Sequence, residues 1–214
     1  PEVRTVLEIG GQDSKMIWIQ NGVVQDFAMN TVCAAGTGSF LDRQAARLGI
    51  DIEELAGLAA ASQHPQRIAG RCAVFAESDM IHKQQEGAAT ADILWGLCKA
   101  LVQNFLNNLA KGHAVKGPVL FQGGVAANGA MLRAFQEELQ MPVKVPRYYD
   151  VMGAWGAAIL AQEAVAEQEG QTKFHGLDAE GPGVIESFIC TDCSNACQII
   201  RTREAVWGSR CGKY

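Results

Sequence analysis

The chain has 214 residues, of which 48% are hydrophobic and 19% are charged. This composition is ordinary for a folded globular protein and excludes a disordered chain. The net charge of -5 and the pI of about 5.4 argue against a nucleic-acid partner held through phosphate contacts. No apolar stretch approaches the roughly 20 residues of a membrane helix, and residues 1–9 lack the pattern of an export signal. We therefore expect a cytoplasmic protein with no membrane partner, built as one packed domain with a smaller appendage.

The first part of the chain predicts an antiparallel β-meander. We expect strands over residues 3–9, 15–20 and 23–28. The glycine-rich segment 10–14 is the first turn, and Asn21-Gly22 is a two-residue sequence that favours a type I′ hairpin.

Helical periodicity dominates the next part, with two further short strands. Asp51 with Glu54 has the pattern of a capping box at the start of a helix. The predicted helices span residues 38–48, 51–61, 72–84, 90–111, 128–139 and 152–168, and the predicted strands span 118–121 and 142–145. A meander followed by alternating helices and strands indicates an α/β fold with helices packed on the sheet.

The composition changes near residue 170. Residues 170–186 are rich in glycine, poor in apolar residues and without periodicity, which is typical of a linker. We therefore predict a main domain over residues 1–169, a linker over 170–186, and a cysteine-rich tail over 187–214 that begins a further domain.

The seven cysteines are an odd number, and without an export signal they argue against a disulfide framework. Cys98 lies in the apolar stripe of the longest predicted helix, so we expect a buried, unreactive residue. Cys190, Cys193 and Cys197 form a C-x2-C-x3-C pattern, and Cys211 follows. This clustering suggests a second cluster or a zinc ion in the tail, with unpaired thiols as the alternative.

A first glycine pair, Gly10-Gly11, lies in the turn between two predicted strands. Glycine lets backbone N–H groups approach a phosphate closely, although such a pair is also common in a turn without a ligand. By analogy with other phosphoryl-transfer sites, Gln12 would position a water molecule and Asp13 would act through Mg²⁺.

A second pair, Gly123-Gly124, lies between a predicted strand and a predicted helix. Nucleotides commonly meet helix N-termini at this place, and Asn128 is suited to cap the helix. A tight strand-to-helix turn without a ligand remains equally consistent with this segment.

Cys33 and Cys72 both come at predicted helix starts. The partial positive charge there lowers the pKa of a thiol and suits an anionic ligand set. Two cysteines supply half of the four thiolates of an iron–sulfur cluster, so either a second copy completes the set or these are independent buried thiols.

Together, five segments resemble the motifs of a known family. They occur in the same order over about residues 3–165 and read GGQDSK, CAAGTGSFLD, CAVFAESD, GGVAAN and GAWGAA. They look like the BadF/BadG/BcrA/BcrD group of 2-hydroxyacyl-CoA dehydratase activators and benzoyl-CoA reductase ATPase subunits. This group belongs to the actin–sugar kinase–acetate kinase superfamily, so the resemblance implies a ribonuclease-H-like fold.

The resemblance also implies cofactors, ATP or ADP with Mg²⁺ between two lobes and one [4Fe–4S] cluster at a twofold interface. Cys33 and Cys72 match the cluster ligands. The matched nucleotide-binding residues are Gly10, Gly11, Gln12 and Asp13 in a phosphate loop, Gly123, Gly124 and Asn128 in and after the adenosine loop, and Gly36 and Gly38 near nucleotide or cluster. The implied partners are a second activase module in a homodimer or pseudo-dimer, a donor such as ferredoxin or flavodoxin, and an acyl-CoA dehydratase or reductase.

The chain departs from the family in two places. No Asp-x-Gly-Ser phosphate loop precedes Glu8, and Glu8 itself stands where short activators commonly have Asp. We therefore expect a C-terminal part or one module of a longer polypeptide. Two other functions stay open: a small-molecule kinase of the same superfamily, which leaves the paired cysteines unexplained, and a non-catalytic scaffold that carries a cluster.

Overall fold

The computed structural model describes residues 2–30, 34–167, 185–203 and 205–214. The chain divides into two compact units, residues 1–160 and residues 161–214. In the described residues, no helix is both long enough and apolar enough to cross a lipid bilayer. The predicted linker over residues 170–186 lies almost entirely outside the described residues, so its assignment stays a prediction.

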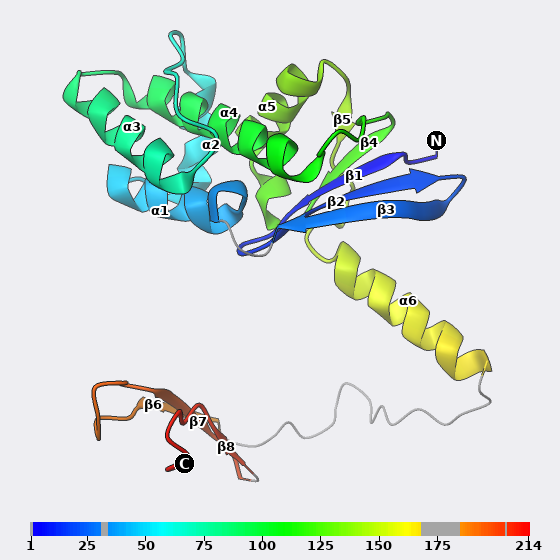
Figure 1. Cartoon of the computed structure of the whole chain (residues 1–214), viewed down its shortest axis with the longest axis vertical. Coiled ribbons are helices and arrows are strands. Elements are labelled where there is room, and N and C mark those ends of the chain that lie inside the picture. Colours follow the sequence, from blue (N-terminus) through cyan, green and yellow to red (C-terminus); the bar gives the residue numbers. More distant parts are fainter. Residues whose placement is uncertain (1, 31–33, 168–184, 204) are drawn as a thin grey trace. The chain divides into compact units, whose positions relative to one another are not determined.

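The first unit contains a five-stranded mixed sheet, shown in Figure 1. Its strands are β1 (Thr5–Ile9), β2 (Ser14–Gln20), β3 (Val23–Asn30), β4 (Val119–Gln122) and β5 (Val143–Lys144). They lie in the order β3-β2-β1-β4-β5, with β2 antiparallel to β1 and β3, and with β1, β4 and β5 mutually parallel. The predicted meander is therefore confirmed, and two crossover strands extend it.

Six helices in the described residues follow the predicted order. They are α1 (Gly38–Leu48), α2 (Ile52–Ala60), α3 (Ala73–Gln85), α4 (Thr90–Leu109), α5 (Gly129–Leu139) and α6 (Met152–Glu167), with short 3-10 turns η1 (Ala34–Gly36) and η2 (Gly124–Ala127). All but α6, which has no buried residue and points away from the sheet in Figure 1, belong to the packed part of the first unit. In Figure 1, α1, α2, α3 and α4 gather on one side of the sheet. The longest helix, α4, packs Phe105 against Phe135 of α5, and Phe135 meets Phe121 of β4. These aromatic contacts pack α4 against α5, and α5 against β4.

Side-chain capping was predicted at two helix starts, and the structure shows it at one of them. Asn128 caps α5 as predicted, because its side chain accepts hydrogen bonds from the backbone N–H groups of Ala130 and Met131. Asp51 occupies the N-cap position of α2, but its side chain makes no capping hydrogen bond. The predicted capping box is therefore wrong, and the Glu54 N–H bonds to the backbone carbonyl of Asp51 instead.

The second unit contains a small antiparallel sheet that the sequence did not predict. Its strands are β6 (Glu186–Ile189), β7 (Gln198–Arg201) and β8 (Val206–Trp207), in the order β6-β7-β8. These strands are short and mostly exposed, so the alternation that identifies a half-buried strand is weak.

Candidate functional site

The turn that follows β1 is fastened to the start of α1 by backbone hydrogen bonds. The N–H of Gly38 donates to the Gly10 carbonyl at 2.9 Å, and the N–H of Ser39 donates to the Gly11 carbonyl at 2.8 Å. A Cβ atom at Gly38 would lie 2.9 Å from Val125 Cγ2 and 3.1 Å from the Gly10 carbonyl oxygen. Glycine at position 38 is therefore what permits the close approach of helix and turn.

The second glycine pair packs against the end of the same strand. Gly123 has a φ of +88°, and a Cβ atom there would lie 2.4 Å from the carbonyl oxygen of Ile9. Its N–H donates to the carbonyl of Tyr149 at 2.8 Å. These constraints fix the second loop beside the first, because only glycine fits both the conformation and the space.

A pocket of about 460 Å³ lies between the two loops. Four of the predicted nucleotide-binding residues line it: Gly11, Gly38, Gly124 and Asn128. Gly10, Gln12, Asp13, Gly36 and Gly123 are not among its lining residues. This volume is within the range of small-ligand and cofactor sites.

The starts of three helices meet at this pocket. Gly38 begins α1, Ile52 begins α2, and Asn128 caps α5. Helix N-termini present free N–H groups and a partial positive charge, which suit phosphate groups. The pocket is therefore chemically matched to a phosphorylated ligand at one side and lined by apolar side chains at another.

Two carboxylates in the pocket wall, Asp42 of α1 and Glu53 of α2, were not predicted as site residues. Asp42 belongs to the CAAGTGSFLD segment, so that motif held a signal for it. No sequence motif indicated Glu53, because its place in the pocket wall depends on how α2 packs beside α1.

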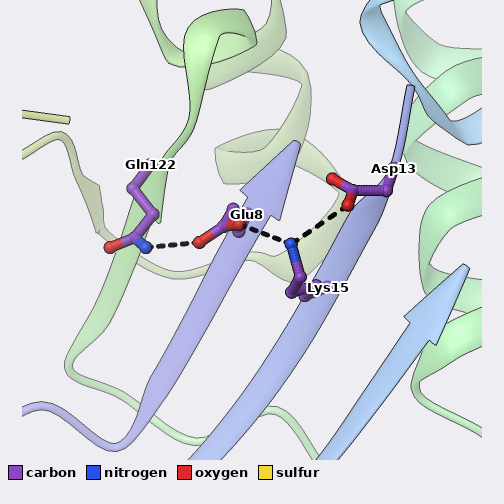
Figure 2. Close-up of polar contacts among 4 residues, drawn as sticks. All are labelled: Glu8, Asp13, Lys15 and Gln122. Carbon is purple, nitrogen blue, oxygen red and sulfur yellow. Dashed lines mark hydrogen bonds and ion pairs between the residues drawn. The ribbon is translucent and has the colours of Figure 1, made fainter. Parts of the chain in front are cut away.

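A polar network lies beside the first turn, as Figure 2 shows. Lys15 Nζ lies 2.9 Å from Glu8 Oε1 and 3.3 Å from Asp13 Oδ2, and Gln122 Nε2 donates to Glu8 Oε2 at 2.6 Å. Burial acts to lower the pKa of Lys15, but the hydrogen bonds and charges of Glu8 and Asp13 outweigh it and raise that pKa. The network holds Asp13 in place, while the side chain of Gln12 is exposed.

Of the two predicted cluster cysteines, the structure describes only Cys72. Cys33 lies outside the described residues. Cys72 is the N-cap residue of α3, is half-buried, and carries a free thiol that makes no capping hydrogen bond. It lines a small cavity together with Ala35, which is two residues after Cys33 in the sequence.

The side chain of Asn104 of α4 contacts residues near both predicted cluster cysteines. Its side-chain Nδ2 donates to the backbone carbonyl of Arg71 at 3.1 Å, directly before Cys72. A Cβ atom at Gly36 would lie 3.1 Å from Asn104 Oδ1, so the loop after Cys33 packs on the same amide. Gly36, three residues after Cys33, and Arg71, directly before Cys72, therefore contact the same buried residue.

Cys98 is fully buried in α4, as predicted, and burial raises the pKa of its thiol to about 12. In the described parts of the chain, no group of three or more His, Cys, Asp or Glu side chains is arranged to hold a metal ion. The predicted metal sites, including the tail cysteines, therefore stay predictions.

Comparison with known proteins gives three main matches. The model of the BadF/BadG/BcrA/BcrD ATPase family matches residues 1–161. The chain is 37% identical to the 2-hydroxyisocaproyl-CoA dehydratase activator of Clostridioides difficile over 81% of the chain and 65% of that protein. It is 38% identical to the (R)-2-hydroxyglutaryl-CoA dehydratase activating ATPase of Acidaminococcus fermentans, over 78% of the chain and 64% of that protein.

A solved structure agrees with these matches. The activator of 2-hydroxyisocaproyl-CoA dehydratase from Clostridium difficile, with bound ADPNP, superposes with a TM-score of 0.73 at 36% identity, over 82% of this chain and 66% of that one. The superposition confirms the ribonuclease-H-like α/β lobe. The chain spans slightly less than two thirds of the length of the relatives it matches.

Proposed function

The chain belongs to the BadF/BadG/BcrA/BcrD ATPase family, and from this premise we propose that it is part of an ATP-driven reductive activator. It takes electrons from a ferredoxin- or flavodoxin-type donor and passes them to a 2-hydroxyacyl-CoA dehydratase or a benzoyl-CoA reductase-like enzyme. The observation that carries this proposal is the pocket between the two glycine loops, where the starts of three helices meet.

ATP with Mg²⁺ is the substrate of this pocket. The helix starts at Gly38 and Asn128 suit its phosphates, and Asp13 offers a carboxylate, the kind of oxygen ligand that Mg²⁺ prefers. The exposed amide of Gln12 orients the attacking water. Hydrolysis adds this water across the terminal phosphoanhydride bond and yields ADP and phosphate.

Cys72, at the start of α3, is suited to be one of the four thiolate ligands of a [4Fe–4S] cluster. Cys72 is free, half-buried and at a helix start, where backbone N–H groups suit an anionic ligand set. When bound, the cluster would supply one-electron transfer at low potential. Cys33 and Cys72 would hold one side of it, and the same cysteines of a second module would hold the other.

The surface beside Cys72 supports pairing with such a module. Val74 and Phe75 follow it by two and three residues in α3, and their side chains are 68% and 65% exposed. Adjacent exposed apolar side chains of this size are typical of an interaction surface. A partner module that covers them would also exclude water from the cluster.

A route for coupling runs from the pocket to Cys72 through two helices. The start of α1 is hydrogen-bonded to the phosphate turn at Gly10 and Gly11. Farther along α1, Gln44 Nε2 donates to Glu77 Oε2 at 3.4 Å, and Arg47 Nη2 lies 2.7 Å from Glu77 Oε1 on α3. A change of the turn on hydrolysis would therefore move α1, and through Glu77 it would move α3 and its first residues.

Anaerobic reconstitution with iron and sulfide tests the cluster. We expect the broad visible absorption of a thiolate-bound cluster, its loss in Cys33→Ala and in Cys72→Ala, and its retention in Cys98→Ala, a matched control in α4. Repeating the measurement in Cys193→Ser separates this signal from any iron in the tail. Absorption that never forms, or that survives both Cys33→Ala and Cys72→Ala, would refute the ligand role.

A further inference from the structure

We propose that Cys190, Cys193, Cys197 and Cys211 form a structural four-thiolate zinc site in the second unit. The topology of the small sheet brings these residues to one end of it. β6 ends at Ile189 and β7 begins at Gln198, so the segment Cys190–Cys197 is the connection between them. This site is independent of the nucleotide pocket and of the role proposed for Cys72.

The connection closes tightly, with a cysteine at each end. The N–H of Cys190 donates to the carbonyl of Cys197 at 2.8 Å, which continues the β6–β7 ladder by one step. Between them, the N–H of Ala196 donates to the carbonyl of Cys193 at 3.2 Å, and Ala196 has a φ of +44°. The C-x2-C spacing within a tight turn is a common zinc-binding arrangement.

The fourth cysteine comes to the same end because β8 runs antiparallel to β7. Directly after β8, Gly208 has a φ of +100°, and a Cβ atom there would lie 2.1 Å from the carbonyl oxygen of Gln198. The chain leaving β8 therefore lies against the residue that follows Cys197. Cys211 lies just beyond this contact.

Contacts of the last residues hold this segment over the cysteine turn. The ammonium group of Lys213 pairs with Asp192 Oδ2, and the Cys190 thiol donates to the same oxygen at 3.5 Å. The ring of Tyr214 packs edge-on against Phe188 of β6, with centroids 5.7 Å apart. Both contacts anchor the residues that follow Cys211 next to Cys190.

The second unit has a very small core. Among its described residues, only Cys190 and Ile199 are buried hydrophobic side chains. A bound metal ion can add stability where a sheet buries so little apolar surface in its described residues. Zinc bound by four thiolates contributes directly to the free energy of folding.

The thiols are free, and their sulfur atoms do not yet form a coordination shell. Cys193 and Cys211 are exposed, Cys197 is half-buried, and Cys190 is buried facing the turn. The backbone thus brings the four residues to one end of the sheet, and binding of a shared ion would require their side chains to turn toward it. A closed set of four thiolates, without an open position, is typical of structural zinc rather than catalytic zinc.

Loading of the full chain with Zn²⁺ or with Co²⁺ under anaerobic conditions tests the site. We expect one zinc ion per chain by elemental analysis, and the visible spectrum of tetrahedral thiolate-bound cobalt. Alkylation followed by peptide mass spectrometry should show Cys190, Cys193, Cys197 and Cys211 protected by zinc. Cys193→Ser and Cys211→Ser, which change exposed residues, should each lose the cobalt spectrum.

Cys72→Ser is the matched control, and it should keep both the zinc and the cobalt spectrum. Three results would overturn the proposal: no zinc uptake, zinc-dependent protection of thiols other than the four tail cysteines, or a cobalt spectrum unchanged in both serine variants. Preferential retention of iron and sulfide by the tail cysteines would overturn the choice of zinc.

Discussion

The guanidinium group of Arg47 lies 2.7 Å from the carboxylate of Glu77, and this ion pair joins α1 to α3. One helix begins at the glycine turn of the pocket, and the other begins directly after Cys72. The ion pair therefore lies between the proposed site of ATP hydrolysis and the proposed site of electron transfer.

Glu77→Gln removes this charge pair while it keeps the side-chain shape. The Arg47 and Glu77 side chains are 52% and 31% exposed, so the loss of stability should be small, about 0–1 kcal/mol. We expect ATP hydrolysis to continue while ATP-dependent electron transfer falls. Parallel assays of phosphate release and of acceptor reduction measure the two activities.

Glu86→Gln is the matched control because Glu86 follows the end of α3 and pairs only with His82 and Lys83, both on α3, among its described ion pairs. It should leave the ratio of electrons transferred to ATP hydrolysed unchanged. An equal change of that ratio in both variants would contradict a specific role for the link between α1 and α3.

Gly38→Ala should impair nucleotide binding. The added Cβ would press on Val125 and on the Gly10 carbonyl, and so separate α1 from the phosphate turn. We expect affinity for a non-hydrolysable ATP analogue to fall at least about tenfold, which corresponds to roughly 1.4 kcal/mol. Isothermal titration calorimetry measures this affinity.

Gly57→Ala provides the control for that substitution. Gly57 lies within α2, and nothing lies within 4 Å of the position of an added Cβ. It should keep normal affinity and raise stability by about 0.4–1 kcal/mol. Normal nucleotide affinity in Gly38→Ala would show that the pocket does not depend on this contact.

Asn104→Ala should weaken both the fold and the cysteine site. It removes the hydrogen bonds that the Asn104 amide makes with the Arg71 carbonyl and with the Asn108 amide, each worth about 0.5–1.5 kcal/mol. We expect a lower melting temperature and less iron incorporated per chain than in Asn107→Ala, an exposed position on the same helix. Equal iron content in the two variants, with Asn104→Ala still folded, would argue against convergence of the cysteine loops on Asn104.

Asp92 should make stability depend on pH in the acid range. Hydrogen bonds from the Ser62 hydroxyl, then from the His64 and Gln63 N–H groups, lower its pKa below the usual 3.8. Because the folded-state pKa is depressed, the stabilisation is complete above the ordinary pKa and is lost as pH falls through the folded value. Asp92→Asn should therefore lower the melting temperature at neutral pH and flatten its decline below pH ~4.

Asp51→Asn controls for a general effect of removing a carboxylate, since the Asp51 side chain makes no capping hydrogen bond. Melting curves recorded by circular dichroism across the acid range compare the two variants. An acid decline in Asp92→Asn as steep as in the unchanged chain would exclude Asp92 as its source.

The sequence predicted the parts of the fold that local patterns determine. The three strands of the meander, the cap at Asn128 and the burial of Cys98 follow from turn chemistry, capping and helical periodicity. The failed capping box at Asp51 shows the limit of such patterns, because a backbone hydrogen bond can replace the side-chain one.

Part of the pocket lining could be anticipated from the glycine motifs. Gly11, Gly38 and Gly124 line the pocket, and at Gly38 an added Cβ would press on Val125 and on the Gly10 carbonyl. The place of Glu53 in the pocket wall and the ion pair between Arg47 and Glu77 could not be predicted, because they depend on how separate helices pack together. The strands of the second unit were missed because few of their side chains are buried.

The central claim is that Cys33 and Cys72 of two modules hold one cluster between them. Native mass spectrometry of the reconstituted chain under anaerobic conditions tests this claim most directly. We predict a dimer that carries one [4Fe–4S] cluster, and a cluster-free chain when Cys72→Ala is introduced. A monomer with a complete cluster, or a Cys72→Ala dimer that keeps it, would contradict the claim.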